Sequence, residues 1–71
     1  MSTPQDVPIR DEPIRIGQFL KLANLAADGG HARELLEAGV VTVNGELEYR
    51  RGAQLHRGDV VAVDGVAVRP S

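Results

Sequence analysis

The sequence predicts an α+β domain in which two short helices pack on a small antiparallel sheet of hairpins. Apolar residues recur at helical spacing between residues 16 and 38, and the pattern changes to alternation after residue 40. Two dipeptides that favour tight hairpins, Asn44-Gly45 and Asp64-Gly65, separate short valine-rich runs. Helices followed by hairpins are typical of a domain with its helices on one side of the sheet.

The first helix is expected to start near Gly17, after a short edge strand or extended lead-in over residues 13–16. Its apolar stripe, at i, i+3, i+4 and i+7, consists of Ile16, Phe19, Leu20 and Ala23. Leu22 and Leu25 widen this stripe, so we expect the helix to be buried on more than one side. Lys21 lies off the stripe and should reach solvent.

The second helix is predicted from Gly30 to Ala38. Asp28 is a suitable N-cap, because its carboxylate can accept from the free amides of the first turn. Gly39 stands where a left-handed C-cap belongs. The apolar face consists of Ala32, Leu35 and Leu36.

The strands follow in two hairpins. Residues 40–43 and 46–49 flank the Asn44-Gly45 turn, and residues 60–63 and 66–68 flank Asp64-Gly65. Between the hairpins lie a basic loop at residues 50–52, an apolar anchor at Leu55 and a turn at residues 57–59. Residues 69–71 are expected to fray.

Length and charge indicate one small domain behind a tail. Three of the four prolines and three acidic residues, against one basic residue, fall within residues 1–13, which we therefore expect to be disordered. Residues 14–71 form the predicted domain and hold seven basic and seven acidic residues. The net charge of −2 thus comes from the tail, and it does not exclude a nucleic-acid partner.

Several classes of function are excluded by composition. The absence of cysteine excludes a disulfide scaffold, a thiolate zinc site and a cysteine nucleophile. The two histidines have no third ligand at workable spacing, so we expect neither a metal nor a cofactor. We also expect no enzyme activity and no small-molecule substrate, because the only serines are terminal and no carboxylates are paired. No run is long and apolar enough for a membrane span or signal peptide, which suggests a cytoplasmic protein without a membrane partner.

Four segments together resemble the S4 RNA-binding domain family. They are residues 18–22, residues 29–33, residues 37–45 and Leu55 with Gly58-Asp59-Val60-Val61. The resemblance extends from Gln18 to Gly65 and is strongest to small, free-standing bacterial S4-like proteins. It implies an S4-like fold, with the αL RNA-binding motif, in which the two helices and the neighbouring loop bind RNA.

The densest basic feature is Arg50-Arg51, which can follow an RNA backbone. Alternation places Arg50 on the same face as Glu46 and Glu48, so we expect Arg51 to be the freer of the two. At the place that matches Arg33 the family has an arginine that contacts RNA. The alternative for Arg33 is a surface ion pair with Glu37.

Gly29-Gly30 opens a helix, where unpaired amides can bind phosphate, although these glycines can also serve only the turn. Lys21 and Arg57 either extend the basic face or are ordinary surface residues. His31 either contacts RNA or has no special role.

The favoured hypothesis is a monomeric, non-catalytic module that binds structured RNA: ribosomal RNA, a ribosome assembly intermediate or tRNA. A ribosome-associated protein-interaction module that docks through Glu34 and Glu37 is the alternative. Convergence of Lys21, Arg33, Arg50 and Arg51 on one face favours RNA, and scatter favours a ribosomal protein partner.

Overall fold

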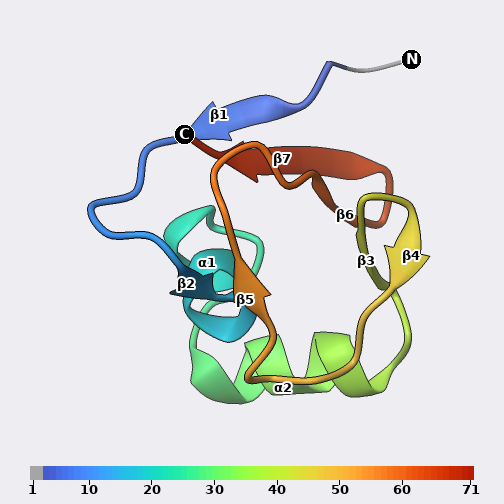
Figure 1. The fold of residues 1–71 in the computed structure, drawn as a ribbon. Coiled ribbons are helices and arrows are strands. Elements are labelled where there is room, and N and C mark those ends of the chain that lie inside the picture. Colours follow the sequence, from blue (N-terminus) through green and yellow to red (C-terminus); the bar gives the residue numbers. More distant parts are fainter. Residues whose placement is uncertain (1–2) are drawn as a thin grey trace.

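The computed structural model describes residues 3–71, in which two helices lie beside a curved sheet (Figure 1). The helices are α1 (Ile16–Leu22) and α2 (Gly29–Glu37). The strands are β1 (Gln5–Val7), β2 (Ile14–Arg15), β3 (Val41–Val43), β4 (Glu46–Leu47), β5 (Gln54–Leu55), β6 (Val61–Val63) and β7 (Val66–Pro70). The predicted α+β class is confirmed. No helix among these residues is long and apolar enough to cross a membrane.

The larger sheet has the strand order β1-β7-β6-β3-β4. Strands β3 and β4 and strands β6 and β7 form the two predicted hairpins, and β3 pairs antiparallel with β6. Strand β1 pairs parallel with β7, so the sheet is mixed and not purely antiparallel as predicted. The difference arises because β1 and β7 come from opposite ends of the chain, a pairing that no local pattern reveals.

The N-terminal segment is ordered where the sequence predicted a disordered tail. Residues 5–7 pair with residues 68–70, and Ile9 is buried in the core. The Ile9 amide donates to the Ser71 carbonyl oxygen at 3.1 Å, and the Ser71 amide donates to that of Val7 at 3.0 Å. These contacts correct the prediction for residues 3–13 and the expected fraying of residues 69–71. Met1 and Ser2 lie outside the described residues.

Both helices bury the predicted apolar stripes. Ile16, Phe19 and Leu20 of α1 are fully buried, as are Ala32 and Leu36 of α2. The prediction that Leu22 widens the buried stripe is wrong, because its side chain is half exposed and lies beside the segment between β1 and β2. Helix α2 starts one residue earlier than predicted.

Three local signals are confirmed. The Asp28 carboxylate caps α2 by accepting the His31 amide at 2.8 Å, and Gly39 after α2 has a φ of +75°. Both hairpin turns have positive φ at their two central residues, as a type I′ turn requires. Strand β4 is shorter than expected because the Glu48 carboxylate accepts the Tyr49 and Arg50 amides, which takes them out of the ladder.

A second sheet of two strands connects the loop after β4 to the start of α1. Ile14 pairs with Leu55, and Arg15 pairs with Gln54. The Ile16 amide also donates to the Ala53 carbonyl oxygen at 2.8 Å. Leu55 is fully buried, as its isolation between two polar loops predicted. These contacts hold residues 50–53 against the N-terminal end of α1.

Candidate nucleic-acid interface

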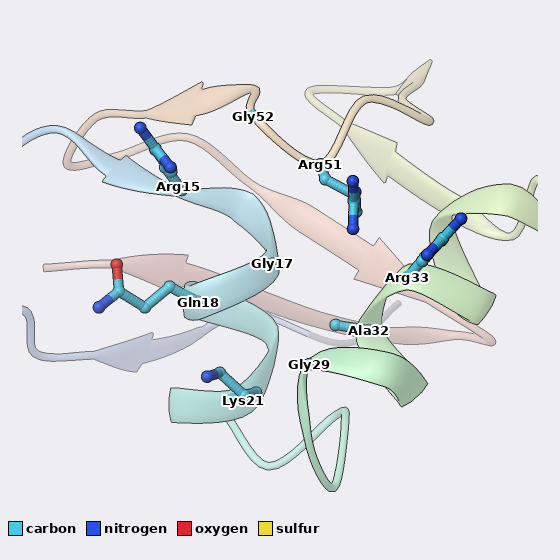
Figure 2. Close-up of a pocket in the computed structure, with 9 residues that line it drawn as sticks. All are labelled: Arg15, Gly17, Gln18, Lys21, Gly29, Ala32, Arg33, Arg51 and Gly52. Carbon is cyan, nitrogen blue, oxygen red and sulfur yellow. The ribbon is translucent and has the colours of Figure 1, made fainter.

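A groove lies where α1, α2 and the loop before β5 meet (Figure 2). It has a volume of about 650 Å³. Four of the residues that line it are basic: Arg15, Lys21, Arg33 and Arg51. The others are small or uncharged: Gly17, Gln18, Gly29, Ala32 and Gly52. We call this surface the cationic groove.

Pairing of β2 with β5 brings two of the arginines to the same groove. Arg15 ends β2, and Arg51 lies three residues before β5. Because Arg15 pairs with Gln54, the start of α1 and the loop around Arg51 are fixed beside each other. Figure 2 shows Arg15 and Arg51 on these two segments, with Arg33 opposite on α2.

The two helices supply the rest of the groove. Gln18 and Lys21 are three residues apart on α1, so they lie on one face. Gly29, Ala32 and Arg33 have the i, i+3, i+4 spacing on α2. The glycine lacks a side chain, and a Cβ added at this position would meet no atom within 4 Å. The groove is therefore open at the start of α2.

The charge of the groove is almost uncompensated. No carboxylate lines it, and among residues 3–71 neither Arg15, Lys21 nor Arg51 forms an ion pair. Arg33 is paired through Nε with Glu37 Oε1 at 2.9 Å, but both side chains are more than half exposed. Such an i, i+4 pair contributes only about 0.3–0.5 kcal/mol, so it does not hold Arg33 away from a ligand. A chain with a net charge of −2 thus presents a local positive surface.

Arg50 does not line the groove, and this separates it from its neighbour Arg51. Its Nε lies 3.2 Å from Glu48 Oε2, and its backbone amide donates to the same oxygen at 3.1 Å. The side-chain hydrogen bond from Arg50 holds the pKa of Glu48 below its ordinary value. Arg50 is thus paired with one of the two glutamates expected beside it, but the pair lies outside β4, where the Glu48 carboxylate also accepts the Tyr49 and Arg50 amides.

Two other candidates from the sequence make contacts elsewhere. The Arg57 guanidinium lies 3.4 Å from Glu12 Oε1, and its Nη2 donates to the Ile9 carbonyl oxygen at 3.2 Å. His31 Nδ1 accepts the Ala27 amide at 3.0 Å in the turn before α2. Gly30 lies outside the groove, next to the Asp28 carboxylate. The structure therefore brings together Lys21, Arg33, Arg51 and Gly29, but not Arg50, Arg57, His31 or Gly30.

Sequence reasoning missed Arg15 and Gln18 as residues of the groove. Gln18 had a signal, because it lies one turn before Lys21 on the same helix face. Arg15 had none, since its place depends on the pairing of β2 with a strand almost 40 residues later.

The fold and the groove define a small domain of a known class. The model of the S4 domain family matches residues 7–69, and the chain belongs to this family. The resemblance found in the sequence motifs is thereby confirmed.

Known proteins that are similar to this chain include the following two. One is the protein of Bacillus subtilis (strain 168) named "Probable ribosome maturation protein RlbA", which is 46% identical over 59 residues, 83% of each chain. The other is the crystal structure of the 30S ribosomal protein S4e from Thermoplasma acidophilum, with a TM-score of 0.64 and 23% identity. That match covers 84% of this chain and 32% of the archaeal one, and it shows a shared fold.

Proposed function

We propose that this protein is a non-catalytic RNA-binding module that holds the backbone of a structured RNA in the cationic groove. The observation that carries the proposal is the convergence of four basic side chains in a groove with no carboxylate in its lining among residues 3–71. Three of the four basic residues expected to converge on an RNA-binding surface, Lys21, Arg33 and Arg51, line this groove. Arg50 does not, because it pairs with Glu48, and Arg15, which the sequence did not suggest, is the fourth basic residue.

The chemistry of the groove suits phosphate groups spaced along a backbone. Arginine donates in a planar fork that matches phosphate oxygens, and Arg15, Arg33 and Arg51 approach from three different segments. Lys21 adds a point charge. The start of α2 leaves room for the RNA but does not form an anion site, because the His31 amide already donates its hydrogen bond to the Asp28 carboxylate. Recognition in the cationic groove is therefore of the RNA shape and backbone, with little readout of sequence.

The relatives favour ribosomal RNA or an assembly intermediate over tRNA. The relative of 46% identity carries ribosome maturation in its name, and the structural neighbour is a protein of the 30S subunit. We place the protein in the cytoplasm, acting as a monomer on RNA during or after ribosome assembly.

Equilibrium binding tests the proposal. A fluorescently labelled RNA hairpin with an A-form stem is titrated with the wild-type protein and with the double variant Lys21→Ala/Arg51→Ala. The wild type should bind, and the double variant should bind at least tenfold more weakly. A hydrogen bond to a charged phosphate contributes ~1.5–3 kcal/mol, and an exposed one contributes about half of that. The double variant loses two such contacts. Equal affinities would contradict the proposal.

A second experiment separates RNA binding from protein docking. The protein is incubated with ribosomal subunits and recovered with and without nuclease treatment. Loss of the bound material after nuclease treatment supports direct RNA binding. Retention of a ribosomal protein after complete digestion of the RNA would favour the docking alternative through the acidic face of α2.

A further inference from the structure

A second groove is lined by α1 and by the segment that joins β1 to β2. Five of its nine lining residues are apolar: Pro8, Ile9, Pro13, Ile14 and Leu22. The other four are polar or charged: Arg10, Asp11, Gln18 and Lys21. Gln18 and Lys21 line both this groove and the cationic groove. The two grooves therefore adjoin at these two side chains of α1, and we call the second one the apolar groove.

Leu22 is the unusual feature of the apolar groove. Its side chain is 49% exposed at the end of α1, although the rest of the stripe on this helix is buried. An apolar side chain left at the edge of a groove gains free energy when a ligand covers it. The groove is therefore suited to a ligand with an apolar surface.

The outer wall of the apolar groove is held in place by Arg57. The Arg57 Nη2 donates to the carbonyl oxygens of Ile9 at 3.2 Å and Arg10 at 3.4 Å, and the backbone amide donates to Glu12 Oε1 at 3.0 Å. These bonds fix residues 9, 10 and 12 of the segment to the turn before β6. A wall fixed in this way reduces the entropy that a ligand must offset on binding.

We propose that the apolar groove takes one unpaired nucleobase of the RNA whose phosphates lie in the cationic groove. This inference rests on the proposed function. A nucleotide joins a flat nucleobase with apolar faces to a phosphate. Lys21 lines both grooves, so it lies where the base and the phosphate of one nucleotide would meet. The Gln18 amide beside it offers a donor and an acceptor, the pair that matches the edge of adenine. Unpaired bases are what proteins read in RNA, because a base within an A-form stem is inaccessible.

The test compares two RNA hairpins that differ by one base. One carries a single bulged adenine, and the other carries an abasic ribose at the same position, so that the number of phosphates is equal. The wild-type protein should prefer the bulged adenine by about fivefold, the size of a contact worth ~1 kcal/mol. The variant Leu22→Ser should bind both hairpins with the same affinity.

Two further variants serve as controls: one removes an exposed apolar side chain elsewhere, and one removes a charge from the cationic groove. Val66→Ser removes an apolar side chain of similar exposure, 47%, from β7 and should keep the preference. Arg51→Ala should weaken both hairpins equally and leave their ratio unchanged.

Two patterns of results would overturn the proposal. Equal binding of the two hairpins by the wild type, or a preference that survives Leu22→Ser, overturns the nucleobase site and leaves the cationic groove intact. Absence of binding to both hairpins, or an Arg51→Ala variant that binds as the wild type does, overturns the proposed function and this inference with it.

Discussion

Replacement of Arg51 by alanine is the sharpest perturbation of the cationic groove, because the adjacent Arg50 provides a control. Both side chains carry one positive charge in the same exposed loop, so either substitution changes the net charge by the same amount. Arg51 lines the groove, whereas Arg50 is held by Glu48 outside it. A difference between the variants therefore reports the position of a charge and not its presence.

The size of the effect follows from the number of basic groups in the groove. Each phosphate neutralised by a cation adds about −0.7 to −0.9 to the slope of log K against log salt concentration. If the four groove cations of residues 3–71 each neutralise one phosphate, the slope is about −2.8 to −3.6, and affinity falls roughly 50- to 150-fold between about 50 and 200 mM salt. Arg51→Ala should make this slope less steep by ~0.7–0.9, while Arg50→Ala should leave it unchanged.

Fluorescence anisotropy of a labelled RNA hairpin, repeated over a series of salt concentrations, measures these slopes. Thermal denaturation is the folding control: Arg51→Ala should not shift it appreciably, and Arg50→Ala should shift it only by the small contribution of its exposed pair with Glu48. The reasoning is refuted if Arg50→Ala and Arg51→Ala change the slope by the same amount. A wild-type slope close to zero would refute it as well.

Three further predictions concern the stability that supports the groove. Leu55→Ala should cost about 2–5 kcal/mol, enough to unfold a small domain at room temperature, whereas Leu47→Ala at a half-exposed site should be nearly neutral; circular dichroism during denaturation separates the two. Asp28→Ala should remove the cap of α2 and lower the free energy of unfolding by about 0.5–2 kcal/mol without weakening RNA binding, as urea denaturation and anisotropy can show. Because the bond from Arg50 lowers the pKa of Glu48 from its ordinary 4.5, Glu48 stabilises the fold fully above that pH and loses this effect as the pH falls through the lowered pKa. The difference in melting temperature between the wild type and Glu48→Gln should therefore shrink below pH 4.5, and a constant difference would contradict this.

The parts of the fold that local chemistry determines were predictable from the sequence. Asp28 and Gly39 mark the two ends of α2, and the Asn44-Gly45 turn closes the first hairpin, because each position demands a particular side chain or a positive φ. The pairing of Arg50 with a nearby glutamate was also predictable, because Glu48 is only two residues away, although the pair lies outside the strand from which alternation placed it.

The parts that depend on distant segments were not predictable. Strand β1 lies in a proline-rich, acidic stretch, and only its pairing with β7 makes it ordered. In the sequence, Arg57 resembled a loop arginine without a partner, because its partner Glu12 is 45 residues away. The same limit hid Arg15 from sequence reasoning, since a strand pairing about 40 residues away places it in the groove.

The most direct test of the central claim is to map the RNA contacts on the protein by nuclear magnetic resonance. An RNA hairpin is titrated into uniformly nitrogen-15-labelled protein, and the shift of each backbone amide is followed. The account predicts that the largest shifts cluster around Arg15–Lys21, Gly29–Arg33 and Arg51-Gly52, while the turn at Asp64-Gly65 stays unchanged. Shifts centred on that turn, with the amides around the groove unmoved, would contradict it.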